Sequence, residues 1–125
     1  MGQSKPINSR SILVVEDEAL IRFNLIDYFE NAGFTVYDAE NADGAISILV
    51  ANSSIRVVLT DVQMPGSMDG LRLAHHIRSR FPPTILFITS GVISLGERDM
   101  PADSFFLPKP FNPRSVVRTI DGLRS

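Results

Sequence analysis

The sequence predicts an α/β fold in which a five-stranded parallel sheet carries helices on both faces. Short apolar runs rich in Val, Ile and Phe are bounded by turn residues, which is typical of buried strands. Amphipathic helical patterns alternate with these runs, and this β-α order builds parallel sheets with right-handed crossovers. A chain of 125 residues is long enough for one such domain with a substantial core.

The first half of the chain is expected to form two strand–helix pairs. The first strand covers residues 12–15, and a helix follows over 18–32, ending at Gly33 as its cap. Residues 35–39 alternate like a strand exposed on one side, as expected near a sheet edge. Asn41 can cap the second helix. The apolar positions expected to face inward from that helix are Ala45, Ile46, Leu49 and Val50.

The middle of the chain continues the same alternation. The third strand is expected over residues 56–60, and a Pro/Gly loop then leads into a helix over 69–80. Pro82 and Pro83 end this helix because proline lacks the backbone donor that a helix interior needs. The fourth strand, residues 84–88, follows at once.

The last quarter of the chain contains the one segment without a clear period. Residues 90–104 hold two glycines and a proline, and we expect a short or irregular helix there. The fifth strand covers residues 105–108, and Asn112 with Pro113 is typical of a helix start. The buried stripe of this last helix is expected to be Val116, Val117, Ile120 and Leu123.

Composition excludes several classes of protein. The net charge of −2 gives no general attraction to nucleic acid or to an anionic membrane. Cysteine is absent, so neither a disulfide framework nor a thiolate metal site can form. No apolar stretch is long enough to cross a membrane, and the polar N-terminus does not look like a signal peptide. We expect a cytoplasmic domain over residues 11–125 behind a loosely ordered lead-in, residues 1–10.

Five polar residues mark the ends of four apolar runs. Glu16 and Asp17 follow the first strand, Asp61 the third, Thr89 the fourth and Lys109 the fifth. Ligands of open α/β sheets bind beyond the carboxyl ends of the strands, so these side chains are expected to converge. Clustered carboxylates need a cation to remain ionised, and Mg²⁺ prefers oxygen ligands. The pattern predicts a phosphoryl-transfer site built around Mg²⁺.

Within this site Asp61 is the better candidate nucleophile. It stands alone before a flexible loop, which leaves room for a phosphodonor, and a carboxylate can form an acyl phosphate. Lys109 would neutralise phosphoryl oxygens, and the Thr89 hydroxyl could hydrogen-bond one of them. Taken singly, each of these residues is more often a turn, strand-end or surface residue. The prediction depends on all four strand ends agreeing.

Three segments together resemble the receiver domain of two-component response regulators. They are Val14-Val15-Glu16-Asp17-Glu18, then Asp61-Val62-Gln63-Met64-Pro65 with Met68-Asp69-Gly70-Leu71, and Leu107-Pro108-Lys109-Pro110-Phe111. The resemblance covers the chain from about Ser11 to Leu123 and implies a flavodoxin-like (βα)5 fold with strand order 2-1-3-4-5.

The resemblance also implies a function and a cofactor. Asp61 would accept a phosphoryl group from a phosphohistidine on a sensor histidine kinase or a histidine phosphotransfer protein. Glu16 and Asp17 would hold Mg²⁺ together with Asp61 and the backbone carbonyl of Gln63. The domain would be a stand-alone switch that signals to an unknown downstream protein, and it would catalyse only its own phosphorylation and dephosphorylation.

Four further residues receive roles from the same resemblance. Lys109 would contact the phosphoryl group, and its peptide bond to Pro110 is expected to be cis. Thr89 would move toward the phosphoryl group and Phe106 would turn inward behind it, although Phe106 could equally be a plain core aromatic.

The sequence departs from the family pattern in four places. Glu16 stands where the family more often has Asp, and the loop 65–68 is one residue longer than usual. Phe106 lacks the hydroxyl that a Tyr would carry, and residues 92–103 are irregular where a fourth helix belongs. Glu16 and the atypical fourth-helix region keep a second hypothesis open, a constitutive binding module that kept the fold without the switch. A third, an enzyme acting on a small phosphorylated substrate, lacks a second acid or base and a substrate pocket. His75 and His76 are interpreted as solvated helix surface, because adjacent helix residues do not face each other.

Overall fold

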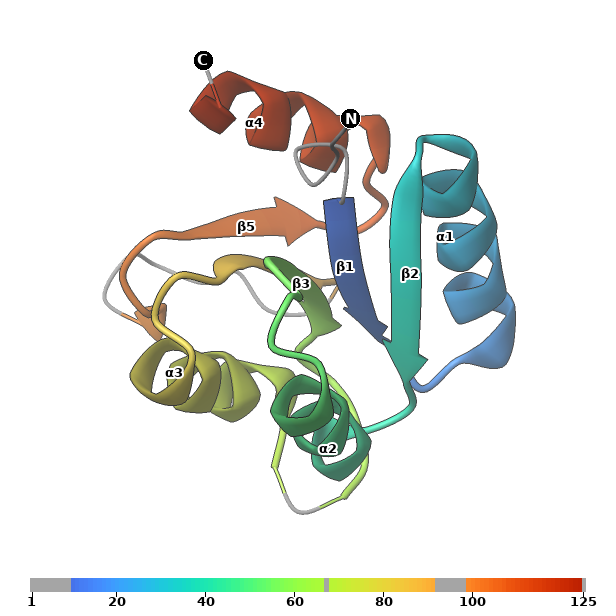
Figure 1. Cartoon of the computed structure of the whole chain (residues 1–125). Helices are drawn as coiled ribbons and strands as arrows, with labels where there is room; N and C mark the ends of the chain where they lie inside the picture. The colour runs from blue at the N-terminus through green and yellow to red at the C-terminus, as the bar shows by residue number, and fades with distance from the viewer. Residues whose placement is uncertain (1–9, 67, 92–98, 125) are drawn as a thin grey trace.

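The computed structural model describes residues 10–66, 68–91 and 99–124. Five strands form one parallel sheet in the order β2-β1-β3-β4-β5, as the sequence predicts (Figure 1). The strands are β1 (Arg10–Val15), β2 (Phe34–Ala39), β3 (Val57–Asp61), β4 (Ile85–Ser90) and β5 (Ser104–Pro108).

The strand register brings the carboxyl ends together. Val15 of β1 pairs with Thr60 of β3, and the next residue of β3, Asp61, pairs with Thr89 of β4. Ser90 in turn pairs with Pro108 of β5. The residues that follow β1 and β5 therefore lie at the same edge of the sheet as the end of β3.

Four helices among the described residues cover both faces of the sheet (Figure 1). They are α1 (Ala19–Asn31), α2 (Ala42–Ala51), α3 (Gly70–Arg80) and α4 (Arg114–Arg124). Two apolar clusters divide the core accordingly. On one face, Leu25 and Phe29 of α1 and Val116 of α4 pack with β1, β3 and β4. On the other, the core includes residues of α2 and α3, such as Leu49 and Leu73.

The helix starts follow from local capping. The Asn41 side chain accepts a hydrogen bond from the Gly44 N–H, and the Asp69 side chain accepts one from the Arg72 N–H. Each thereby satisfies a backbone donor that the first turn of a helix leaves free. Asn112 does the same before α4, where it accepts from the Arg114 N–H at 2.9 Å. The two caps expected from the sequence, at Asn41 and Asn112, are confirmed.

Two predictions of burial are wrong. Val50 is 71% exposed, because the inward stripe of α2 runs through Ala42, Ala45 and Leu49 and turns the next position away from the core. Leu123 is 56% exposed, because the last turn of α4 extends beyond the core that buries Val116.

Other expectations meet the limits of the described residues. Of the expected lead-in, residues 1–10, only Arg10 is described, and it belongs to β1. The middle of the segment expected to form an irregular helix, residues 92–98, lies outside the described part of the chain. No helix in residues 10–66, 68–91 or 99–124 is long and apolar enough to cross a membrane.

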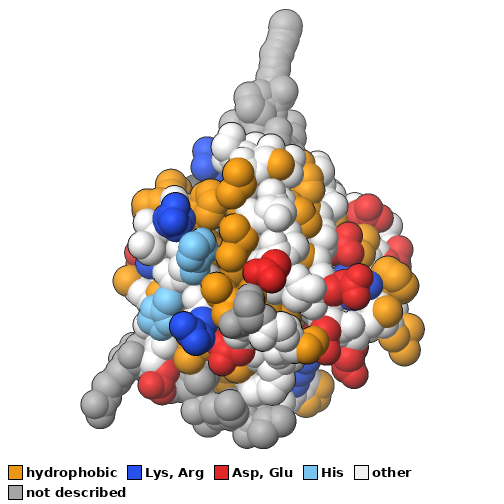
Figure 2. All heavy atoms as spheres, turned by 90° about the horizontal axis from the view of Figure 1, so that it is seen from below, with side chains coloured by type: hydrophobic (Ala, Val, Ile, Leu, Met, Phe, Trp, Pro, Cys, Tyr) orange, Lys and Arg blue, Asp and Glu red, His pale blue; other side chains and the backbone are white. Residues whose placement is uncertain are grey.

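The outer surface of α3 does more than face solvent. His75 is exposed, as expected, but its Nε2 also lies 2.9 Å from the carbonyl oxygen of Asp99. Arg78 donates to the carbonyls of Ala102, at 2.8 Å, and Asp103, at 3.1 Å. Figure 2 shows the molecule from below. In this view the two histidines and several basic side chains lie on the side of α3, and most acidic side chains lie on the opposite side. Helix α3 thus holds the segment that leads into β5.

Candidate functional site

Three carboxylates converge at the carboxyl end of the sheet. Glu16 and Asp17 follow β1 and Asp61 ends the neighbouring strand β3, and one oxygen from each lies within 4.8 Å of the others. Glu16 and Asp61 are buried, whereas Asp17 is exposed. The structure therefore brings together the acidic residues that the strand ends predict.

The backbone of Glu16 is held from both sides. Its N–H donates to the Ala39 carbonyl at 3.0 Å, which ties the loop to the end of β2. Its carbonyl accepts a hydrogen bond of 2.8 Å from Nη1 of Arg22, a buried residue of α1. The Glu16 carboxylate accepts a hydrogen bond at Oε2 from the Glu18 N–H, at 3.0 Å, which holds the side chain against its own loop. These contacts fix the acidic loop before any ligand binds.

The two oxygens of Asp61 have different surroundings. Oδ2 lies 3.3 Å from Nζ of Lys109. Oδ1 is buried and has no hydrogen-bond partner. Buried carboxylate oxygens normally find a donor or a cation, so an orphaned one marks a place where a ligand belongs.

Gly70, the first residue of α3, packs against the backbone of Asp61. The Gly70 N–H donates to the Val62 carbonyl at 2.9 Å, which presses the start of α3 against the end of β3. A Cβ atom at Gly70 would lie 1.8 Å from the carbonyl oxygen of Asp61, far closer than two such atoms can approach. Only glycine leaves both the strand end and the helix start where they are. The sequence motif contains this glycine, but its contact is visible only in three dimensions.

Lys109 reaches the acidic cluster from the other side. Its Nζ lies 3.4 Å from Oε1 of Glu16 as well as 3.3 Å from Asp61, and its backbone N–H donates to the Ser90 carbonyl at 3.0 Å. The Lys109–Pro110 peptide bond is cis, as the family resemblance implies. One ammonium group thus faces two buried carboxylates.

The remaining predicted residues lie at defined places around the cluster. Thr89 is buried at the end of β4, and its carbonyl accepts a 2.9 Å hydrogen bond from the Val62 N–H. Phe106 is half-buried in β5, paired with Ile88. The side chain of Gln63 accepts a hydrogen bond from the Ser90 hydroxyl at 3.1 Å. The switch roles of Thr89 and Phe106 and the ligand role of the Gln63 carbonyl stay predictions.

Electrostatics at the site favour a bound cation. Burial raises the pKa of Glu16 and of Asp61 above their ordinary values, and the neighbouring carboxylates add to this, although Lys109 opposes it. Burial lowers the pKa of Lys109, but attraction to Asp61 and Glu16 outweighs burial and the pKa is raised. When ionised, the three carboxylates of the cluster thus carry more negative charge than the single Lys109 ammonium can neutralise.

The donor set fits Mg²⁺. This ion takes oxygen ligands at about 2.1 Å in an octahedron, so its ligands stand about 3 to 4 Å apart. The three carboxylate oxygens within 4.8 Å of one another need to close by only a small side-chain movement. One or two carboxylates with water and a phosphate are the usual Mg²⁺ environment.

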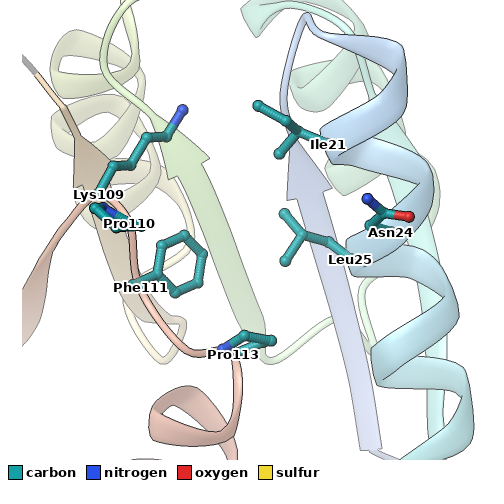
Figure 3. A pocket seen from close by; sticks show the side chains of 7 residues that line it. All are labelled: Ile21, Asn24, Leu25, Lys109, Pro110, Phe111 and Pro113. Atoms are coloured by element: carbon teal, nitrogen blue, oxygen red, sulfur yellow. The ribbon is translucent and has the colours of Figure 1, made fainter.

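An apolar groove opens beside this cluster. It has a volume of about 440 Å³ and lies between α1 and the segment that joins β5 to α4. Figure 3 shows Phe111 pointing into the groove toward Leu25 of α1, with Ile21 and the ammonium end of Lys109 at one end of it. A molecule bound in the groove would therefore lie next to the acidic cluster.

Comparison with known proteins agrees with this geometry. The family model described as the response regulator receiver domain matches residues 12–121. The chain belongs to this family.

Receiver-domain relatives include longer proteins. The transcriptional regulatory protein ResD of Bacillus subtilis is 36% identical over 123 residues, which cover 93% of this chain and 48% of ResD. The sensor kinase CckA of Brucella abortus is 31% identical over 116 residues, 90% of this chain and 12% of that protein. The chain thus spans about half or less of the length of these relatives.

Solved receiver structures share the fold. A response regulator receiver protein from Sinorhizobium medicae is 26% identical with a TM-score of 0.84, covering 94% of this chain and 96% of that one. The response regulator TrrA from Thermotoga maritima, solved in complex with Mg²⁺-BeF, is 25% identical with a TM-score of 0.76, covering 91% and 98%. The five-stranded order described above is therefore that of a receiver domain.

Arg22 is the site residue that the sequence predictions missed. The signal was present, because Arg22, Leu25 and Phe29 share the buried face of α1 at helical spacing. An arginine at the start of an otherwise apolar stripe indicates a buried guanidinium with dedicated partners.

Proposed function

We propose that this receiver domain is a phosphorylation-dependent switch whose phosphoacceptor is Asp61. The observation that carries the proposal is the Asp61 carboxylate, which pairs with the Lys109 ammonium through Oδ2 while its buried Oδ1 has no hydrogen-bond partner. A carboxylate nucleophile needs an oxygen that no protein donor engages, and a nearby positive charge to balance the incoming phosphoryl oxygens.

The donor is a phosphohistidine of a sensor histidine kinase or a histidine phosphotransfer protein. The bond from phosphorus to the imidazole nitrogen breaks as the bond to a carboxylate oxygen of Asp61 forms, and the released imidazole takes up a proton. Lys109 stays positively charged and pairs with a phosphoryl oxygen, and the Thr89 hydroxyl donates to another. When bound by Glu16, Asp17, Asp61 and the Gln63 carbonyl, Mg²⁺ supplies the remaining positive charge.

The output is a change in protein–protein contacts rather than turnover of a substrate. A phosphoryl group shifts the domain between two conformations only as far as its contacts differ between them. Thr89 and Lys109 supply that difference, and Phe106 follows by repacking in β5. The site belongs to a cytoplasmic signalling protein, with no role assigned in binding nucleic acid or membrane.

Intact-protein mass measurement tests the acceptor. With Mg²⁺ and a small phosphodonor such as acetyl phosphate, the wild type should gain the mass of one phosphoryl group. Asp61→Asn should abolish the gain, because an amide cannot form the acyl phosphate. Asp27→Asn, a change of the same type on the exposed surface of α1, should label like the wild type.

Two results would refute the proposal. Equal labelling of Asp61→Asn would show that another residue accepts the phosphoryl group. A wild type that never labels, from a small phosphodonor or from a histidine kinase, would favour the constitutive binding module instead.

A further inference from the structure

We propose that Arg22 is a positioning residue for the Mg²⁺ site, holding the Glu16–Asp17 loop in its binding geometry. The inference rests on the proposed function, because it concerns how this chain prepares its acidic loop for the ion. It assigns a role to a residue of α1 that lies outside the carboxylate cluster and contributes no ligand atom.

Arg22 is buried on the core-facing side of α1, where charged residues are rare. Only 7% of it is exposed, and it lies on the core face of α1 with Leu25 and Phe29. Burying a guanidinium costs free energy unless partners compensate for the lost water. Its location therefore depends on the partners that it finds.

Two partners meet the guanidinium from different elements. Nη1 donates to the Glu16 carbonyl at 2.8 Å, in the loop after β1. Nε lies 3.1 Å from Oδ2 of Asp38, near the end of β2, as an ion pair without hydrogen-bond geometry. Because the guanidinium is planar and rigid, a contact at one edge restricts the direction of the other. Asp38 thereby orients Arg22, and Arg22 orients the loop.

The atom that Arg22 holds is well placed to control the metal ligands. The carbonyl of Glu16 belongs to the peptide unit that joins Glu16 to Asp17, so fixing it fixes where the Asp17 side chain begins. The Glu16 N–H is already tied to the Ala39 carbonyl at 3.0 Å. Without Arg22, that peptide unit could rotate and Asp17, which is exposed, would spend less time near Asp61.

The charge of Arg22 has the opposite effect on metal binding. A positive charge near the cluster repels Mg²⁺, so its removal by electrostatics alone would tighten binding. Loss of positioning would weaken binding, as happens when residues that orient metal ligands are removed. The sign of the change in Mg²⁺ affinity therefore separates the two effects.

Calorimetric titration of the full chain with MgCl₂ tests the proposal. Arg22→Gln should weaken Mg²⁺ binding about tenfold. Arg22→Lys keeps the charge but cannot reproduce the guanidinium geometry, so it should weaken binding about three- to fivefold. Arg118→Gln removes the same charge from the exposed face of α4 and should stay within about twofold of the wild type.

Phosphodonor labelling over a series of Mg²⁺ concentrations provides the second measurement. In Arg22→Gln the half-saturating Mg²⁺ concentration should rise by the factor found in calorimetry, with the maximal rate reduced less than about twofold. A purely structural role would lower the amount of folded protein without changing the affinity of the folded fraction. Urea unfolding of each variant determines that fraction.

The outcomes separate this inference from the proposed function. If the wild type binds Mg²⁺ and is labelled, but Arg22→Gln binds Mg²⁺ as tightly or more tightly, the positioning role is wrong and the proposed function stands. Should Arg22→Gln fail to fold, Arg22→Lys decides alone, and wild-type affinity in that variant overturns the inference. A wild type that binds no Mg²⁺ overturns both.

Discussion

Strands β3 and β5 both deliver a charged residue to the site, but they are embedded very differently. Every residue of β3 is buried, and the strand pairs with β1 on one side and β4 on the other. Strand β5 is at the end of the sheet order, with its first four residues half-buried and its last exposed. The proposed acceptor Asp61 is thus held by a strand that is buried throughout, and Lys109 follows a strand at the edge of the sheet. The side of the site formed by β3 with Asp61 is therefore called its fixed half, and the side formed by β5 with Lys109 its adjustable half.

This difference suits a switch. An acceptor must keep its geometry relative to the carboxylates of β1, since small displacements reduce transfer rates strongly. A lysine that reports the presence of a phosphoryl group must be able to move with its strand. Three sets of variants test this interpretation, in order of decreasing expected effect on stability.

The largest single loss of stability is expected in a pair of matched leucines from the two strands. Leu59 in β3 is 2% exposed, and Leu107 in β5 is half-buried against the same apolar cluster. Leu59→Ala should lower the free energy of unfolding by about 3 kcal/mol, and Leu107→Ala by about half as much, because less buried surface and a smaller cavity are involved. Urea unfolding measures both values. Equal losses would show that β5 is as confined as β3.

A second comparison uses one glycine from each half. Gly70→Ala places a Cβ against the Asp61 carbonyl and should cost about 2 to 3 kcal/mol as the strand end and helix start separate. Gly91→Ala brings its Cβ only to 3.5 Å from Cβ of Lys109, an ordinary contact, and should cost less than about 0.5 kcal/mol. Phosphodonor labelling should slow markedly in Gly70→Ala alone. Unchanged labelling in that variant would contradict the fixed position of Asp61.

The smallest expected effect is that of the Asp61 charge on how the free energy of unfolding depends on pH. Burial raises the pKa of Asp61 in the folded chain above its ordinary value of 3.8. Between those two pKa values the folded protein binds more protons than the unfolded one, so the free energy of unfolding falls as pH rises through this window. Above the window the ionised Asp61 carboxylate costs stability. Lys109, whose pKa is raised, stays protonated throughout.

Asp61→Asn isolates this cost. In the presence of a chelator the variant should be more stable than the wild type at neutral pH, by about 1 kcal/mol, with the advantage shrinking as the pH is lowered toward about 4. Urea unfolding across this pH range supplies the measurement. An advantage that grows on acidification would contradict the direction of the Asp61 pKa shift.

The fold and the acidic cluster could be predicted because each depends on local patterns. Apolar runs ending in Glu16, Asp61 and Lys109 specify strands and their ends, and parallel pairing then brings the ends to one edge. The strand order came from the family resemblance, since apolar runs alone do not determine which strands are neighbours.

What could not be predicted depends on contacts between distant segments. Arg22 shares a helical stripe with Leu25 and Phe29, but its partners, Asp38 and the Glu16 carbonyl, come from other segments and are visible only in three dimensions. The need for glycine at position 70 follows from an approach to the Asp61 backbone that no pattern encodes. The exposure of Val50 does not follow from its apolar character, because single exposed apolar residues are common on protein surfaces.

The long sequence separation within the site has a consequence for the chain during synthesis. Lys109 and Glu16 meet although they are 93 positions apart, and Asp61 comes from the strand between them in the sheet. A ribosome-bound chain that has not yet released β5 would carry uncompensated acids and no Lys109 ammonium to pair with the oxygens of a phosphoryl group. Under the proposed function the site is therefore completed only by the final strand, and a half-made copy should compete poorly with finished ones for a phosphodonor.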